Sequence, residues 1–532
     1  MFELGYNNFA LILFIFILTV PFLFAYITAS LRQMHMFQLN SYTAAKHLRW
    51  MKKNFSAILT NVFALVLSFL IFPAVVLFFG IYIYALLLII FGFINIPKKR
   101  AKKPLVFTPR VIRMFVTETV VTLLIVLVSF FCFGGGVPAL LLLTSVLMGL
   151  YALVPFIVIL VNYINSPVEA AVRQHYINDA KKMLKSCPDL KVIGITGSFG
   201  KTSMKFYLST LLRGKYDTLM TPESYNTPMG VVKTIRGSLK GYHQIFVCEM
   251  GAYRVGEIDE LCRIADPDHG IVTSIGPQHL ETFKSVENVV KTKFELADHV
   301  HKKQGTCFVN LDNEFIRSNL PEGAVTYGTT EDCDYYAKVI SVSRQGTRFT
   351  VRFPGGETEE FNSILIGGHN VVNLCGAVAM AHFMGVSPAE MKAQMPKITS
   401  VPHRLQLLEK GPYTIIDDAF NSNPAGSSAA LDTLALFEDF KILVTPGMVE
   451  LGEKQDELNR EFGRHAAKVC DYVVLVGKKQ TAPILAGLKD ESYPDEKIFV
   501  ADTFNEGINH AYAIGADRRK IILLENDLPD NY

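Results

Sequence analysis

The sequence has few features of a zinc protein, a disulfide-rich protein or a nucleic-acid-binding protein. Its eight cysteines include no C-x-x-C pair and no metal-finger spacing, so they indicate scattered reduced thiols of a cytosolic domain. The net charge of only +3 gives no global indication of nucleic-acid binding. No internal repeat or low-complexity segment is present. With 532 residues, the chain is expected to form two to four units.

Hydrophobic residues are concentrated in the first 165 residues. They make up 50% of the whole chain, and the mean hydropathy of +0.27 is high for a soluble enzyme. A membrane helix needs about 20 apolar residues. Five spans are predicted: 9–29, two within 55–94 that turn near Pro73 to Gly80, 114–133 and 138–163. One long buried helix over 55–94 is the less favoured alternative. The N-terminal flank MFELGYNN has no basic residue, which favours a retained helix over a cleaved signal peptide.

The loops between these spans predict the orientation of the chain. Basic loops stay on the cytoplasmic side, whereas the uncharged Gly134–Gly135–Gly136 link fits the outside. Two loops are basic: the first contains Arg32, Lys46, Arg49, Lys52 and Lys53, and the second contains Lys98, Lys99, Arg100, Lys102, Lys103, Arg110 and Arg113. We therefore predict a multi-pass protein of the cell membrane with its N-terminus outside and everything after residue 165 in the cytoplasm. Binding of anionic lipid head groups is an alternative role for the basic loops.

A phosphate-binding loop follows the membrane part. Residues 166–190 are predicted to be a polar helical linker, after which short β-branched runs alternate with helical patterns, as in α/β proteins. The strand 191–196 leads into a glycine loop and then a helix, which is the context that phosphate binding requires. Lys201 would contact the β- and γ-phosphates of ATP, and the Thr202 hydroxyl would bind Mg²⁺. The predicted nucleotide-binding residues are Thr196, Gly197, Ser198, Phe199, Gly200, Lys201, Thr202 and Ser203.

The spacing of glycines in this loop indicates a particular protein family. A general Walker loop has glycine five residues before Gly200, where this chain has Ile195. The shorter pattern T-G-x-x-G-K-T is similar to the phosphate loop of Mur ligases and folylpolyglutamate synthases. Further motifs follow in order: SYNTPMGVVKTI, FVCEMGAYRVGEI, SIGPQHLETF, VVKTKFEL, GGHNVVNLCGAVAMA, VPHRL, IIDDAFNSNP and PGMVELG. Over about residues 190–480 the chain resembles the Mur ligase family, most of all the MurF type, which adds D-alanyl-D-alanine.

Hydropathy and this resemblance together give the expected domain plan. Residues 1–165 would form an α-helical membrane domain of about five spans, followed by the linker 166–190. Residues 191–398 would form an α/β central domain with the phosphate loop, and 399–532 a smaller Rossmann-like C-terminal domain. Only about 25 residues separate the last span from the phosphate loop, too few for the soluble domain that grips UDP in Mur ligases.

The metal residues combine position with resemblance. Glu249 ends an apolar run that predicts a strand, so its carboxylate is expected at the ligand-binding edge of a parallel sheet, where it would bind Mg²⁺ with Thr202. Without the neighbouring motif, Glu249 would be interpreted as an ordinary surface carboxylate. The resemblance implies that His279 binds a second Mg²⁺. It also implies that Lys293 reacts with CO₂ to give a carbamate whose oxygens lie near the metals, with Lys291 as the competing residue.

Four further residues are predicted on the nucleotide side by resemblance. Arg404 resembles the arginine that helps to hold the phosphates, and its guanidinium suits forked contacts. Asp418 resembles an acidic residue that contacts the nucleotide from the last domain. Asn370 or Asn373 would contact the adenine side, although a helix cap or turn is an equally good interpretation of each asparagine.

The resulting functional prediction is an ATP-dependent acid–amino-acid ligase of peptidoglycan synthesis, of class EC 6.3.2. It would activate a carboxylate as an acyl phosphate, with Lys201, His279, Lys293 and Arg404 as catalytic residues, and would use ATP and two Mg²⁺ ions. Its partners would be an acid and an amine, with a lipid-linked acid suggested by the missing UDP domain. A K-G-S-R type motif, usual in MurF-type chains, is replaced by IILLENDLPDNY.

Two alternatives remain open from sequence. One is a membrane transporter driven or regulated by a cytosolic ATPase domain. Against it, Glu118 is the only acidic residue within a predicted span, whereas ion paths usually need more polar groups. The other is a poly-amino-acid or capsule synthase, which would use the same ATP chemistry repeatedly.

Overall fold

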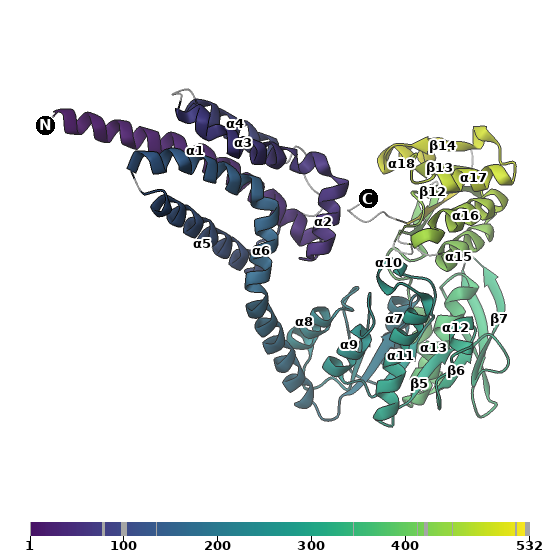
Figure 1. The fold of residues 1–532 in the computed structure, drawn as a ribbon. Coiled ribbons are helices and arrows are strands. Elements are labelled where there is room, and N and C mark those ends of the chain that lie inside the picture. Colours follow the sequence, from purple (N-terminus) through teal and green to yellow (C-terminus); the bar gives the residue numbers. More distant parts are fainter. Residues whose placement is uncertain are drawn as a thin grey trace. The chain divides into compact units, whose positions relative to one another are not determined.

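The computed structural model describes residues 2–76, 80–96, 104–134, 136–343, 345–411, 413–419, 424–449, 451–515 and 519–526. Contacts between residues divide the chain into two units, Met1–Gln174 and His175–Tyr532. The first unit is built from helices and the second from two sheets with covering helices (Figure 1).

The first unit contains the predicted apolar helices. They are α1 (Phe2–Leu39), α2 (Ala44–Lys53), η1 (Phe55–Ile58), α3 (Leu59–Val76), α4 (Gly80–Asn95), α5 (Pro109–Cys132) and α6 (Gly136–Lys185). Most of the linker predicted at 166–190 is therefore the continuation of α6 rather than a separate helix. The predicted turn between α3 and α4 falls partly on residues 77–79, and the second basic loop partly on 97–103, both outside the described residues.

Length and composition support three of the five predicted spans among the described residues. Ile15–Leu39, Pro109–Cys132 and Leu142–Lys185 are long and apolar enough to cross a membrane. The apolar segments Phe55–Phe69 and Ile81–Asn95, in the positions of the second and third spans, are shorter. Many large apolar side chains are exposed on these helices.

Buried polar contacts hold the first unit together. The Ser30 hydroxyl on α1 donates to the Glu118 carboxylate on α5. Asn95 on α4 donates to the Tyr151 hydroxyl on α6 over 2.8 Å, and Tyr151 donates to Thr60 on α3 over 2.9 Å. Buried polar groups require such partners. These contacts therefore link α1 to α5, and link α3 and α4 to α6.

The second unit begins with a nine-stranded sheet of order β2-β3-β1-β4-β5-β6-β7-β8-β9. The strands from β2 to β7 are parallel, and β7 to β9 form an antiparallel meander. They are β1 (Lys191–Thr196), β2 (Thr218–Met220), β3 (Ile245–Glu249), β4 (His269–Val272), β5 (Cys307–Asn310), β6 (Val325–Gly328), β7 (Tyr335–Ser343), β8 (Gly346–Arg352) and β9 (Thr358–Ser363). Apolar runs such as β1 and β3 are buried on both faces, as parallel strands between helices must be.

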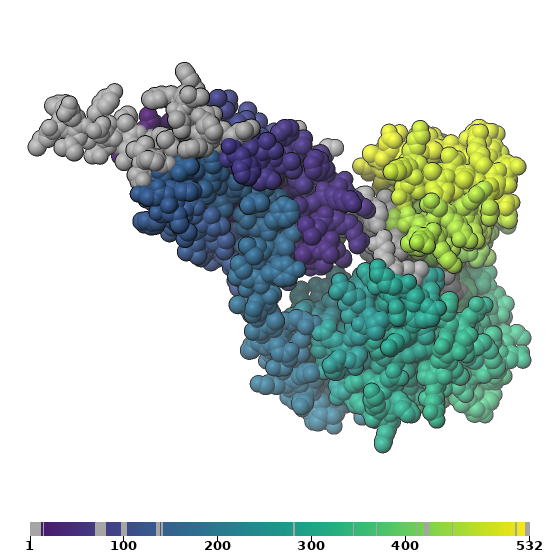
Figure 2. All heavy atoms as spheres, viewed as in Figure 1, coloured from purple at the N-terminus to yellow at the C-terminus, as the bar shows by residue number. Residues whose placement is uncertain are grey.

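Helices cover both faces of this sheet, and Figure 2 shows the teal and green residues packed into one body. One apolar core joins the sheet to α7 (Lys201–Leu212), α13 (Gly368–Phe383) and α14 (Pro388–Gln394). The other joins it to the end of α6 and to α8 (Pro228–Ser238), α9 (Glu257–Ala265) and α11 (Val286–Lys302). The short helices are α10 (Leu280–Phe283), α12 (Glu314–Arg317) and η2 (Met395–Lys397).

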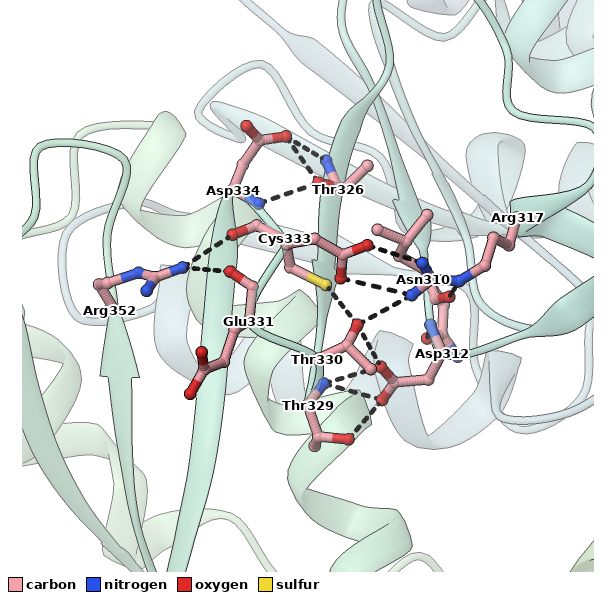
Figure 3. A network of polar contacts seen from close by, with 12 residues as sticks. Asn310, Asp312, Arg317, Thr326, Thr329, Thr330, Glu331, Cys333, Asp334 and Arg352 are labelled. Atoms are coloured by element: carbon pink, nitrogen blue, oxygen red, sulfur yellow. Dashed lines mark hydrogen bonds and ion pairs between the residues drawn. The ribbon is translucent and has the colours of Figure 1, made fainter.

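A polar network fixes the loops after β5 and β6 (Figure 3). Asp312 accepts hydrogen bonds from the Thr329 backbone N–H at 2.8 and 2.9 Å and from the Thr329 hydroxyl at 2.8 Å. Arg317 donates to Asp332 over 2.6 Å and to Thr330 over 3.0 Å. Because Asp312, Arg317 and Thr330 each contact more than one other residue, the network stiffens this part of the sheet edge.

The C-terminal part contains a six-stranded sheet of order β10-β11-β15-β12-β13-β14, parallel except for β10. Its strands are β10 (Gln406–Lys410), β11 (Tyr413–Asp418), β12 (Phe440–Thr445), β13 (Tyr472–Val476), β14 (Ile498–Ala501) and β15 (Lys520–Glu525). One apolar core includes α15 (Pro424–Ala435), α16 (Gln455–Val469) and α17 (Ala482–Asp490), and the other includes α18 (Phe504–Ala513). Short 3₁₀ turns are η3 (Gly452–Lys454) and η4 (Asp495–Lys497).

Candidate active site

The glycine loop between β1 and α7 has the backbone geometry of an anion cradle. Gly197 has φ +151° and Gly200 has φ +79°. A Cβ atom on Gly197 would lie 2.1 Å from the Thr273 hydroxyl oxygen, and one on Gly200 would lie 2.8 Å from the Asn373 amide oxygen. Only glycine fits both positions. The loop opens directly into the N-terminus of α7, where free N–H groups favour an anion.

Lys201 begins α7 and folds back over this loop. Its ammonium donates to the carbonyl oxygens of Gly197 at 2.7 Å and Ser198 at 3.0 Å. Burial lowers the pKa of Lys201 to about 8, Glu249 opposes that shift and Arg404 adds to it. The cation thus lies at the loop that would receive phosphate.

Glu249 ends β3, in register with Ile195 of the neighbouring β1. Its Oε1 accepts hydrogen bonds from the Thr202 hydroxyl at 3.1 Å and the Asn226 amide at 3.0 Å, and its Oε2 lies 3.0 Å from the Lys205 ammonium. Burial raises the pKa of Glu249, but the nearby lysines and the Asn226 hydrogen bond outweigh burial and hold it below its usual range. Glu249 is therefore a carboxylate, which suits Mg²⁺.

Lys293 and His279 approach the same cavity from other elements. Lys293 on α11 is 2% exposed, whereas Lys291 is exposed. Burial and repulsion by Lys201 hold the pKa of Lys293 well below its usual range, against attraction by Glu257 and Glu295. His279 has a left-handed φ of +52°, and its ring lies 4.4 Å from that of Tyr253, measured between centroids.

One cavity of about 170 Å³ brings together the predicted metal residues Thr202, Glu249, His279 and Lys293 with Lys201 and Arg404. Among the described residues, including those of this cavity, no group of three or more His, Cys, Asp or Glu side chains could hold a metal ion. The donors present, one hydroxyl and one carboxylate beside a phosphate cradle, fit Mg²⁺ that arrives with a nucleotide, because hydrated Mg²⁺ needs few protein ligands.

A second pocket shares Phe199 and Gly200 with this cavity and contains the predicted residues Asn370, Asn373, Arg404 and Asp418. Arg404 lines both pockets. The Asn370 side chain is engaged within the fold: it accepts from the Tyr207 hydroxyl at 2.8 Å and donates to the Ile366 carbonyl at 2.9 Å. Asn373, which faces Gly200, is thus the better placed of the two asparagines.

The segment that carries Arg404 is held in an unusual backbone conformation. Its neighbours His403 and Leu405 have φ values of +61° and +48°, which cost non-glycine residues about 1 kcal/mol or more each. Asp417 lies 2.8 Å from the His403 ring nitrogen, and Asp418 accepts the Leu405 N–H at 2.9 Å. Asp418 therefore anchors the backbone beside Arg404, a role that its sequence pattern did not predict.

Sequence reasoning missed three residues at the site: Lys205, Asn226 and Tyr253. Lys205 lies one helical turn after Lys201, and that i, i+4 spacing could have indicated a second lysine on the same helix face. Asn226 belongs to the quoted motif SYNTPMGVVKTI, but only the fold brings it to Glu249. No spacing marks Tyr253, which lines the cavity beside His279.

Comparison with known proteins agrees with this geometry. The Mur ligase middle domain matches residues 195–381, and the Mur ligase glutamate ligase domain matches residues 403–525. The UDP-N-acetylmuramoyl-tripeptide–D-alanyl-D-alanine ligase of Escherichia coli is 30% identical over 319 residues, which are 58% of this chain and 70% of that protein. The chain belongs to the Mur ligase family.

Two further similarities support this membership. The Bacillus subtilis ligase of the same name is 31% identical over 276 residues, 51% of this chain. This chain spans only 59% of that relative's length. The crystal structure of MurF from Acinetobacter baumannii matches with a TM-score of 0.61 and 27% identity, and the match covers 67% of this chain and 77% of that one. The expected central and C-terminal α/β domains of a Mur ligase are thereby confirmed.

Proposed function

We propose that the chain is an ATP-dependent ligase that joins the carboxylate of a cell-envelope precursor to an amine. The observation that carries this proposal is the single cavity lined by Lys201, Thr202, Glu249, Lys293 and Arg404. It combines a phosphate cradle, a carboxylate and several cations, which is what transfer of a phosphoryl group between two anions requires.

The reaction has to bring a carboxylate against the γ-phosphate of ATP. Lys201 and Arg404 would offset the repulsion between these two anions and stabilise the charge on the transferring phosphoryl group. Thr202 and Glu249 would hold Mg²⁺, which supplies further positive charge at the phosphate oxygens. The resulting acyl phosphate would then be attacked by the amine, which forms the amide and releases phosphate. The C-terminal domain would exclude water during this second step.

A carbamate on Lys293 belongs to the same proposal. A lysine buried in a cationic cavity is destabilised as an ammonium, so the free amine is available to attack CO₂. The new N–C bond and the loss of a proton from the nitrogen would convert this neutral amine into an anionic carbamate. Its oxygens, together with His279, would then favour a second metal ion in the same cavity.

For the substrates, the names of the relatives suggest UDP-N-acetylmuramoyl-tripeptide as the acid and D-alanyl-D-alanine as the amine. The apolar helices that precede the Mur region instead suggest an acid presented at the cytoplasmic membrane face, such as a lipid-linked precursor. Either acid would offer a carboxylate to the cavity, so the type of reaction is the same for both.

An ADP-release screen of the purified full-length protein tests this function. Panels of acids would include the muramoyl tripeptide and lipid-linked acids, each with and without candidate amines. The proposal predicts ADP release that needs both an acid and an amine, together with an amide product. ATP turnover that needs neither and accompanies solute movement in vesicles would contradict it in favour of a transporter. Repeated addition to one product would identify a polymer synthase.

A further inference from the structure

A second lysine of α7 lies deep beside the phosphate loop. Lys205 is fully buried, and its ammonium lies 3.0 Å from Glu249 Oε2. It also donates to the backbone carbonyl of Glu223. A buried ammonium is costly unless it is paired and hydrogen-bonded in this way. One side chain thus contacts both the metal-binding carboxylate and the loop of residues 221–226.

This loop is tied to Glu249 at several points. The Glu249 N–H donates to the Thr221 hydroxyl at 3.1 Å, and the Asn226 amide donates to the Glu249 carboxylate at 3.0 Å. Ser224 and Asn226 line the cavity. Glu223 has a left-handed φ of +42°, which costs a non-glycine residue about 1 kcal/mol. The backbone carbonyl of this strained residue accepts the hydrogen bond from Lys205.

We propose that Lys205 is a positioning residue that couples the loop 221–226 to Glu249, so that binding of a magnesium nucleotide orders the loop facing the acid substrate. This inference rests on the proposed function. A metal at Thr202 and Glu249 draws on the same carboxylate that Lys205 and Asn226 contact. Any change there is passed to Glu223 through the Lys205 ammonium. Without Lys205, the loop keeps its Thr221 and Asn226 contacts with Glu249 but loses the bond from the Lys205 ammonium to the Glu223 carbonyl.

Hydrogen exchange of the full-length protein, read by mass spectrometry with and without Mg²⁺ and ADP, tests this coupling. In the wild type we expect Mg²⁺-ADP to slow exchange in peptides covering 221–227. In Lys205→Met we expect about tenfold faster exchange in these peptides and loss of the nucleotide effect, while the peptides of β4 and β5 stay protected. Lys205→Gln, which retains hydrogen-bonding groups, should show a smaller change.

Lys233→Met is the matched control. Lys233 is exposed, and its ammonium donates to the Tyr225 hydroxyl of the same loop at 3.1 Å, but it makes no contact with Glu249. This variant should exchange like the wild type. If Mg²⁺-ADP binds but the loop of both Lys205 variants responds as in the wild type, the coupling is wrong while the ligase function stands. Faster exchange throughout the central domain of the Lys205 variants would show that Lys205 stabilises the fold as a whole, and this would contradict the coupling. If the wild type fails to bind Mg²⁺-ADP, both proposals fail.

Discussion

The carboxyl edges of the two parallel sheets carry opposite charge. At the edge of the nine-stranded sheet, Lys205 pairs with Glu249, and Lys201 and Lys293 line the same cavity as this carboxylate. Burial lowers the pKa of each of the three lysines. At the edge of the six-stranded sheet, Asp418 and Glu525 end the adjacent strands β11 and β15 as a register pair. Burial, with Asp418 next, raises the pKa of Glu525 well above its usual range.

This contrast shows how the same edge geometry serves two purposes. Buried cations without enough carboxylates favour the arrival of anions, as a phosphate site requires. Two adjacent buried carboxyls instead favour one shared proton, so they act as hydrogen-bonding groups of the fold. Asp418 accordingly accepts the Leu405 N–H, and Glu525 accepts the Ser427 hydroxyl at 2.5 Å. Arg404, carried by the segment that Asp418 anchors, faces the cationic edge.

Among the substitutions proposed here, Lys293→Ala at the cationic edge is expected to change the ligation rate most. Lys293→Ala should lower the ligation rate by about a thousandfold or more, because the proposed carbamate would supply a ligand of the metal cluster. Short carboxylic acids such as formate should restore part of the activity by replacing the carbamate. Lys291→Ala, on the exposed face of the same helix, is the control. Full activity of Lys293→Ala would remove the carbamate from the account.

A second substitution breaks the phosphate contact itself. Lys201→Met should weaken binding of Mg²⁺-ADP by about 30-fold to several hundred-fold, since loss of a buried charge partner costs about 2–4 kcal/mol. Isothermal titration calorimetry measures the affinity. Lys215→Met removes an exposed lysine just beyond the end of the same helix and should bind like the wild type. Equal affinities in both variants would place the phosphates elsewhere.

Arg404→Lys separates the charge of Arg404 from its geometry, because lysine retains the positive charge but lacks the forked guanidinium. We expect about a tenfold loss in kcat/KM, which corresponds to about 1.4 kcal/mol. Thermal stability should be unchanged, since no buried partner is lost. A variant with wild-type kinetics would show that Arg404 supplies charge alone.

The smallest effect concerns the acidic edge. Because the folded-state pKa of Glu525 is raised, its contribution to stability is present below the ordinary value of 4.5 and is lost as pH rises from there toward the raised value. Glu525→Gln mimics the neutral carboxyl and should remove this loss. Thermal unfolding at pH 8 should then occur a few degrees higher than in the wild type, about 2–4 °C per kcal/mol, and should be similar near pH 4. A lower unfolding temperature at pH 8 would contradict the shared proton.

Local sequence predicted most of the fold and much of the site. The strand, glycine loop and helix around Lys201 form one continuous segment, so their pattern predicts their geometry. Contacts between distant segments were harder to foresee. Asn226 reaches Glu249 only because β2 lies beside β3, and Asn370 is occupied by Tyr207, 163 residues earlier in the chain. The continuous α6 was also missed, because the change from apolar to polar residues near 165 does not interrupt a helix.

Calorimetry of ADP binding to the wild-type chain, with and without Mg²⁺, tests whether the phosphate loop and Glu249 form a magnesium–nucleotide site. We expect a dissociation constant below about 1 mM that rises by at least about tenfold when Mg²⁺ is removed. No binding at millimolar ADP, or binding indifferent to Mg²⁺, would contradict a magnesium–nucleotide site at Thr202 and Glu249.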